Sequence, residues 1–211
     1  MTQKRSLEMK MVEAVFCILY LLFVFIAALI FFKRGQYLRC CLAAVLAIGD
    51  SFHLFPRIKI DLKGEGKNDA HRLQLGNIIS SLTVTLFYVI LLPVMKQTDE
   101  AVKVPSFFFH ALLVLAAIRI YMLGMPQNDW FKRNKKETRW YLYRNIPFCL
   151  MGLLTIIYLI LYYKAYLTAI LVLVSFACYM GTVILARKDP KMGMLMIPKT
   201  LCYVWIIALF L

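Results

Sequence analysis

The chain has 211 residues, of which 62% are hydrophobic and 17% charged, with a mean hydropathy of +0.73 and a formal net charge of +14. Such a composition excludes an ordinary soluble domain and is typical of an integral membrane protein. The excess of basic residues does not indicate nucleic-acid binding, because these residues are spread over several short loops and do not form one face of a soluble module.

Seven segments are long and apolar enough to cross a bilayer, whose hydrocarbon core takes about 20 helical residues. They lie near 13–32, 37–55, 75–95, 103–124, 147–163, 166–186 and 193–211. The first is too long for a signal peptide and lacks a small-residue cleavage site, so we expect it to remain as a span. The sequence therefore predicts an all-α, polytopic transmembrane helix bundle of about seven spans, forming one domain over residues 1–211.

The distribution of basic residues predicts the orientation of these spans. The N-terminus and the even-numbered loops hold 17 Lys and Arg residues, whereas the other side holds six: Lys33, Arg34, Arg39, Lys96, Lys103 and Lys164. Basic residues are enriched on the cytoplasmic side of membrane proteins. We therefore expect a cell-membrane protein with its N-terminus in the cytoplasm and its C-terminus outside.

Motifs for cofactors and metals are missing from the sequence. It has no phosphate loop, no internal repeat and no metal-ligand spacing, and its six cysteines lie in apolar segments without C-x-x-C pairs. We interpret these cysteines as small buried hydrophobes. The sequence predicts neither a cofactor nor a metal, and it leaves membrane lipids as the expected partners.

The loop at 127–145 mixes six cations with five aromatic residues. Indole and phenol rings favour the headgroup layer, and cations attract anionic lipids. We expect an interfacial helix there, which anchors the chain and forms a wall near the lipid headgroups.

The most informative residue is Asp50, which lies inside the second predicted span. A carboxylate in hydrocarbon costs several kcal/mol unless it is paired, protonated or facing a cavity. His53 follows three residues later and Arg57 four after that, so all three share one helix face. Such a group is suited either to holding a lipid headgroup or to general acid and base chemistry.

Two more cations lie at a similar depth. From the predicted spans, Asp50 lies about 6 Å, Arg119 about 8 Å and Lys199 about 4–5 Å to the cytoplasmic side of the midplane. We expect Asp50 to pack toward Arg119 or Lys199, because each charge alone in hydrocarbon would be costly. The alternative interpretation is a structural ion cluster that joins three helices without catalysis.

The run GDSFHLFPR, from Gly49 to Arg57, resembles the YhhN family of membrane proteins, whose characterised animal relatives are lysoplasmalogenases. That family has a Gly-Asp pair near the end of an early span, followed by an apolar stretch and a basic residue. A glycine-containing turn then leads into a span ending in tyrosine, which is similar to Gly76 through Tyr88 here. The aromatic and aliphatic ending of the last span, Tyr203 to Leu211, is also similar.

The resemblance implies an intramembrane hydrolase that cleaves the vinyl ether of a lysophospholipid. For such a hydrolase we expect Asp50 and His53 as catalytic residues, with Arg57, Tyr88, Arg119 and Lys199 binding the substrate.

The chain departs from the family pattern at three points. The family usually has eight spans, it often has a histidine where this chain has Thr85, and it tends to have a Ser-Asp pair where Ser175 is followed by Phe176. Vinyl ether hydrolysis needs both proton delivery and activated water, for which two carboxyl groups are a natural pair. With Asp50 alone, His53 is expected as its partner. The second hypothesis is therefore a non-enzymatic protein that binds or transports lipids or small molecules with the same residues.

Overall fold

Seven long helices make up most of the computed structural model, which describes residues 7–63, 66, 68–128, 130, 140–185 and 190–211. They are α1 (Leu7–Lys33), α2 (Tyr37–Lys63), α3 (Asp69–Thr98), α4 (Phe107–Gly124), α6 (Ile146–Leu161), α7 (Tyr166–Leu185) and α8 (Met196–Ala208). The short elements are α5 (Trp140–Tyr143) and the 3₁₀ turns η1 (Pro126–Asn128) and η2 (Pro190–Leu195). The described part contains no strand, so the predicted all-α fold class is confirmed.

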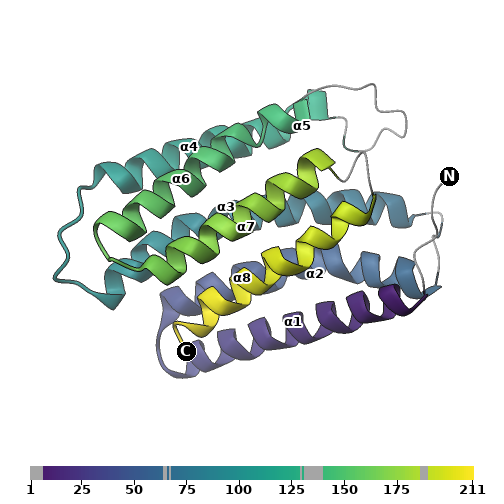
Figure 1. Cartoon of the computed structure of the whole chain (residues 1–211), viewed down its shortest axis with the longest axis horizontal. Coiled ribbons are helices and arrows are strands. Elements are labelled where there is room, and N and C mark those ends of the chain that lie inside the picture. The colour runs from purple at the N-terminus through teal and green to yellow at the C-terminus, as the bar shows by residue number, and fades with distance from the viewer. Residues whose placement is uncertain (1–6, 64–65, 67, 129, 131–139, 186–189) are drawn as a thin grey trace.

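The helices lie side by side in one bundle (Figure 1), and α8 packs against both α7 and α1. The first described turn of α1 lies at one end of the bundle, and the end of α8 lies at the other. The turn between α1 and α2 depends on Gly35, whose φ of 70° suits glycine. There the amide of Gln36 donates to Phe31 O and that of Gly35 to Phe32 O, which is the Schellman helix ending.

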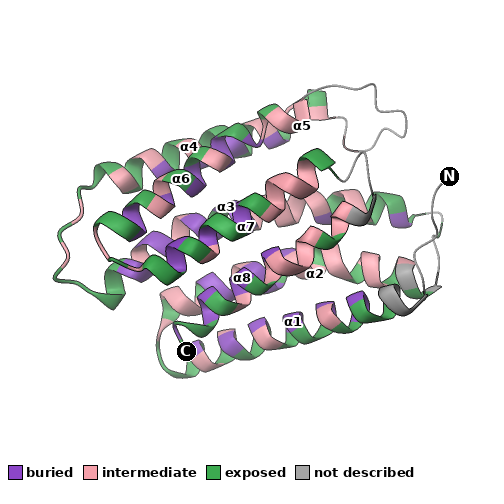
Figure 2. Ribbon diagram, viewed as in Figure 1, coloured by how far each residue is buried: buried purple, intermediate pink, exposed green. Residues whose placement is uncertain are grey.

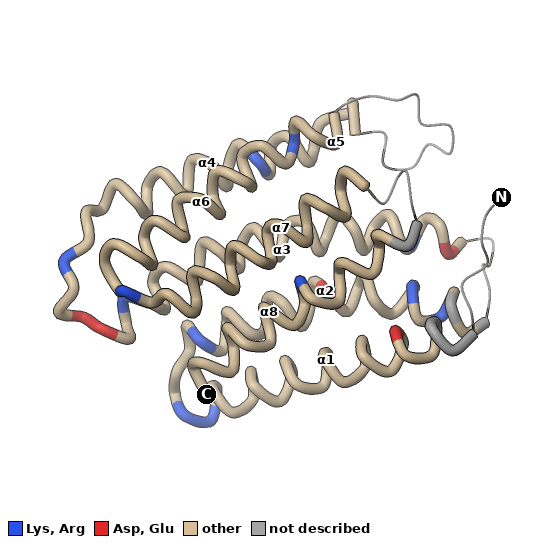
Figure 3. Tube along the Cα trace, viewed as in Figure 1, with Lys and Arg blue, Asp and Glu red and all other residues tan. Residues whose placement is uncertain are grey.

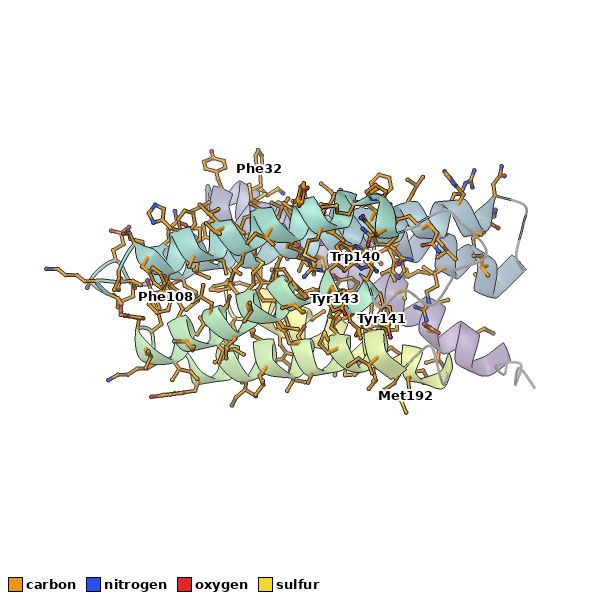
Figure 4. The ribbon with its side chains drawn as sticks, turned by 90° about the horizontal axis from the view of Figure 1, so that it is seen from above. Phe32, Phe108, Trp140, Tyr141, Tyr143 and Met192 are labelled. Atoms are coloured by element: carbon orange, nitrogen blue, oxygen red, sulfur yellow. The ribbon has the colours of Figure 1, made fainter. Side chains whose placement is uncertain are left out.

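The outward faces of the helices are apolar. Figure 2 shows exposed residues along the outer side of α1 and buried ones facing its neighbours, and Figure 4 shows the exposed Phe32 pointing out of the bundle. Lys, Arg, Asp and Glu lie mainly at the two ends of the bundle (Figure 3). Six helices of the described part are long and apolar enough to cross a membrane. Apolar outer faces on helices of this length indicate a multi-pass membrane protein, since only hydrocarbon covers so much exposed apolar surface and each helix satisfies its own backbone hydrogen bonds there.

The seventh predicted span corresponds to a shorter element. α8 has 13 residues, and the six residues of η2 precede it in the same direction (Figure 1). At about 1.5 Å per α-helical residue and about 2 Å per 3₁₀ residue, the two together reach about 30 Å.

Two helices extend beyond their predicted spans at the end where α1 begins. α2 continues from residue 55 to Lys63 through Pro56, and α3 starts at Asp69 instead of residue 75. Pro56 leaves the Phe52 carbonyl without its helical donor, and Gly76 of α3 packs against that carbonyl. Further along, Lys59 Nζ donates to Asp69 Oδ1 at 2.9 Å. These contacts stabilise α2 and α3 beyond their apolar segments. Hydropathy does not predict this part of the two helices, because its residues are mostly polar.

The expected interfacial helix at 127–145 falls largely on residues 129 and 131–139, which lie outside the described part of the chain. On its flanks, the Arg144 guanidinium lies 4.1 Å from the centre of the Trp130 ring and donates to Asn128 Oδ1 at 2.9 Å. Trp140, Tyr141 and Tyr143 belong to the single turn of α5 (Figure 4).

Candidate functional site

A narrow cavity lies between α1, α2, α3 and α8. We call it the Asp50 cavity. It measures about 30 Å³, room for one or two water molecules. Its lining residues are Glu13, Phe16, Cys17, Asp50, His53, Leu54, Arg57, Ser80, Met196, Ile197, Lys199 and Thr200.

Two hydroxyl groups hold the Asp50 carboxylate. The Tyr20 hydroxyl of α1 donates to Oδ2 at 2.6 Å, and the Ser80 hydroxyl of α3 donates to Oδ1 at 3.0 Å. Hydrogen bonds from neutral hydroxyls to an ionised carboxylate are short and strong. They fix both oxygens of Asp50 from two neighbouring helices and leave lone pairs for water or a substrate.

Small residues bring α2 and α3 close enough for this contact. A Cβ atom at Gly49 would collide with the Thr83 side chain, and one at Gly76 would collide with backbone atoms of Phe52 and His53. Gly76, Ser80 and Thr83 lie on one face of α3, a pattern of small residues common where membrane helices touch. The glycine of the Gly-Asp pair therefore places the aspartate against α3.

His53 lies one turn after Asp50 and also lines the cavity. Its Nδ1 atom is buried and has no hydrogen-bond partner in the described part of the chain. A histidine with a free ring nitrogen beside a carboxylate can accept or deliver a proton.

A second carboxyl group, which the sequence analysis did not identify, also lines this cavity. Glu13 of α1 is 8% exposed and forms an ion pair with Arg57. The sequence analysis considered Asp50 alone, but α1 supplies a second carboxyl group to the cavity from the start of the first span. The signal was available: Glu13, Cys17 and Tyr20 recur on one face of a helix that is otherwise apolar from Met11 to Phe32.

Lys199 is the buried cation that the structure brings to Asp50. It is 6% exposed and lines the same cavity, and its charge acts on the carboxylate without a direct ion pair between them. Its ammonium lies 4.9 Å from the ring centre of Tyr179 and 5.5 Å from that of Tyr203. Aromatic faces of this kind stabilise a cation away from water.

Arg119 and Tyr88, the other two expected site residues, are not among the residues that line the cavity. Arg119 is fully buried, with its guanidinium carbon 3.3 Å from the centre of the Phe148 ring. The Tyr88 hydroxyl donates to that of Tyr203 at 3.4 Å. We call this second group the Arg119 cluster, whose members are Tyr88, Arg119, Phe148, Ser175, Phe176, Tyr179 and Tyr203.

Phe176, which follows Ser175 on α7, belongs to the Arg119 cluster. Its ring centre lies 4.5 Å from that of Phe148 and 5.0 Å from that of Tyr88. It also packs against Gly152, where a Cβ atom would meet the ring. An aromatic ring therefore fills the space between these residues.

Comparisons with known proteins return no match, whether to a family model, a curated protein or a solved structure. The geometry of the Asp50 cavity therefore indicates what chemistry the protein can carry out. There, two carboxyl groups, an imidazole with a free nitrogen and a buried ammonium surround a space of water size, a set suited to proton transfer next to an anionic group.

Proposed function

We propose that this protein is an intramembrane lipid hydrolase resembling a lysoplasmalogenase, and that it cleaves the vinyl ether of a lysophospholipid. The observation that supports this proposal best is the Asp50 carboxylate. It faces a water-sized cavity beside His53 and is held by two neutral hydroxyls, and among the described residues it has no direct ion pair. A carboxylate kept in hydrocarbon only to balance a cation would be expected to contact that cation.

In the proposed reaction, Asp50 acts as general acid and base with His53 assisting. A proton goes to the alkenyl carbon, water adds to the resulting oxocarbenium carbon, and the hemiacetal collapses to a free aldehyde and a glycerol hydroxyl. Lys199 and Arg57 line the cavity and are the cations suited to the phosphate. Because the cavity has room only for water, we expect α1 and α8 to separate when a lipid enters.

The proposal includes the topology. The enzyme would lie in the cell membrane with its N-terminus in the cytoplasm, because 17 of the basic residues fall on that side. The first described turn of α1 and the end of α8 lie at opposite ends of the bundle, which supports an odd number of crossings. A reporter fused to the C-terminus should be active outside the cytoplasm, and cytoplasmic activity would overturn the orientation.

The Phe176 position favours a second candidate, a non-enzymatic protein that binds or transports lipids. The ring of Phe176 lies in an aromatic cluster, so this chain lacks the carboxylate that the family pattern puts there. In that case Asp50 and Lys199 would bind a headgroup without proton transfer.

Aldehyde release by purified protein separates these two functions. The wild-type protein should release aldehyde from an alkenyl lysophospholipid, and Asp50→Asn should reduce turnover by about 10²-fold or more, because asparagine keeps the volume but cannot exchange a proton. Asp99→Asn, in the exposed α3–α4 loop, is the matched control and should retain full turnover. If wild-type protein binds the lipid without aldehyde release and Asp50→Asn changes only affinity, the binding function replaces the enzyme.

A further inference from the structure

An open groove lies between α2 and α3, near the end of the bundle where α1 begins (Figure 1). We call it the Phe55 groove. It has a volume of about 480 Å³, and its lining residues are Ser51, Phe52, Phe55, Pro56, Arg72 and Leu75. None of them lines the Asp50 cavity, because Phe52 and Phe55 lie on the outward side of α2 and Asp50 lies on its inward side. The two sites therefore share a helix but no space.

The close approach of α2 and α3 explains why the groove forms. Gly76 packs against backbone atoms of Phe52 and His53, so no bulky side chain fits between the two helices there. The rings of Phe52 and Phe55 share one face of α2, stay outside this contact and are 54% and 60% exposed. Leu75, which is 41% exposed, lines the groove from α3. Apolar side chains from both helices therefore border a hollow that neither helix fills.

The groove is apolar along its walls and cationic at one end. Leu75 is the first residue of the third predicted span, and the exposed Arg72 lies about one helical turn before it, outside that span. This position puts the guanidinium at the depth of the lipid headgroups. An apolar hollow that ends in a cation at this depth has the polarity of a membrane lipid, whose acyl chains lie deeper than its phosphate.

The chain around Arg72 carries a net positive charge. Lys59 Nζ and the Gly66 amide donate to the two oxygens of Asp69, and the charge of Arg72 acts on the same carboxylate. One carboxylate cannot neutralise two cations. Over residues 56–74 of the sequence, five Lys and Arg residues stand against three Asp and Glu residues. Such a segment attracts anionic lipids, and a guanidinium can bind phosphate through two parallel N–H donors.

We propose that the Phe55 groove binds one phospholipid with an anionic headgroup, whose phosphate contacts the Arg72 guanidinium and whose acyl chain lies between the Phe55 and Leu75 side chains. A mostly apolar pocket of this size with a single charged group is typical of sites that fix the orientation of an amphipathic ligand. The bound lipid belongs to the bilayer and is distinct from the substrate, because α2 separates the groove from Asp50. The site therefore does not depend on the proposed hydrolase.

Lipid binding to the purified full chain in detergent micelles, measured by native mass spectrometry, tests the site. The probes are palmitoyl-oleoyl phosphatidylglycerol, which is anionic, and phosphatidylcholine with the same chains, which is zwitterionic. The wild-type protein should retain one phosphatidylglycerol per chain, with an affinity about tenfold above that for phosphatidylcholine. Arg72→Gln should abolish this preference, because glutamine lacks the charge and the paired donors of guanidinium. Lys103→Gln, which removes one charge from the exposed α3–α4 loop, is the matched control and should keep the preference.

A second variant tests the apolar part of the groove. Leu75→Trp fills part of the hollow and should lower the affinity for both phospholipids about tenfold. Leu113→Trp is its matched control, because Leu113 is 39% exposed on α4, away from the groove, and it should bind lipid like the wild type. If Leu75→Trp does not fold, the wild-type protein and Arg72→Gln decide the matter.

The proposal is overturned if the wild-type protein retains no phosphatidylglycerol or binds the two phospholipids equally, or if Arg72→Gln keeps the preference. It is also overturned if a folded Leu75→Trp binds like the wild type. Displacement of phosphatidylglycerol by an equal concentration of palmitoyl lysophosphatidylglycerol would overturn it as well, because the groove would then be a site for the single-chain substrate. None of these measurements follows aldehyde release, so a failure of the hydrolase would leave their result unchanged.

Discussion

The Asp50 cavity and the Arg119 cluster both bring charge into the bundle, but they balance it differently. In the cavity, Asp50 is held by two hydroxyls, Glu13 by Arg57, and the space between them has room for water. In the cluster, the Arg119 guanidinium is fully buried against the ring of Phe148, and α4, α6 and α7 contain no acidic residue. Acidic groups beside a space of water size suit proton transfer, whereas the rings of the cluster stabilise an enclosed cation away from water. Lys199 connects the two regions, because it lines the Asp50 cavity and its ammonium lies against two tyrosine rings of the Arg119 cluster.

The largest expected effect on stability comes from adding a methyl group to α3 where it packs directly against the backbone of α2, next to the Asp50 cavity. At Gly76, a Cβ atom would lie under 3.0 Å from backbone atoms of Phe52 and His53, which cannot rotate away. Gly76→Ala should therefore lower the free energy of unfolding by about 3 kcal/mol and displace His53. Gly152→Ala, in the cluster, meets the Phe176 ring, which can turn, so about 1 kcal/mol is expected.

Reversible unfolding in mixed micelles would measure these differences. Gly124→Ala is the control, because nothing lies within 4 Å of the position that its added methyl group would take, and its stability should stay within about 0.5 kcal/mol of wild type. Equal losses of unfolding free energy for Gly76→Ala and Gly152→Ala would contradict this difference, in which the α2 backbone cannot move away but the side chains of the Arg119 cluster can.

The sequence predicted the helices well but placed the site only in part. Long apolar runs located all seven helices, because length and hydropathy decide which segments can span. Depth along a span gave Arg119 and Lys199 as alternatives beside Asp50, and of these two Lys199 lines the Asp50 cavity whereas Arg119 does not. Depth fixes the height of a residue but not its angle around the bundle, and α4 faces α3 and α6, with α1 and α2 lying elsewhere.

Contacts between helices account for what the sequence analysis missed. Glu13 and Tyr20 come from α1, which packs on α2 in a register that no single-helix pattern specifies. Their shared face on α1 was a usable signal, since polar groups repeated at helical spacing in a span indicate an inward side.

An intermediate effect is expected from deleting single hydroxyls in the two regions. Tyr20→Phe removes a donor from the Asp50 carboxylate and should cost about 2 kcal/mol, because a bond to a charged, half-buried group is lost. Tyr88→Phe removes only a 3.4 Å contact to another hydroxyl and should stay within about 0.5 kcal/mol. The exposed Tyr121→Phe serves as a control for loss of a phenol. Equal costs for Tyr20 and Tyr88, measured by the same unfolding assay, would show that Asp50 is not charged in the folded protein.

The smallest expected effect is the coupling between Glu13 and Arg57. Their side chains are 11% and 21% exposed, so the pair lies between a surface ion pair and a buried one. A double-mutant cycle with Glu13→Gln and Arg57→Met should give a coupling of about 1 kcal/mol, which weakens as salt is raised. A coupling of about 3 kcal/mol that does not change with salt concentration would mean that the cavity excludes water as fully as the Arg119 cluster does. The distinction between a hydrated acidic site and an enclosed cationic one would then fail, and with it the supply of water that the proposed hydrolysis needs.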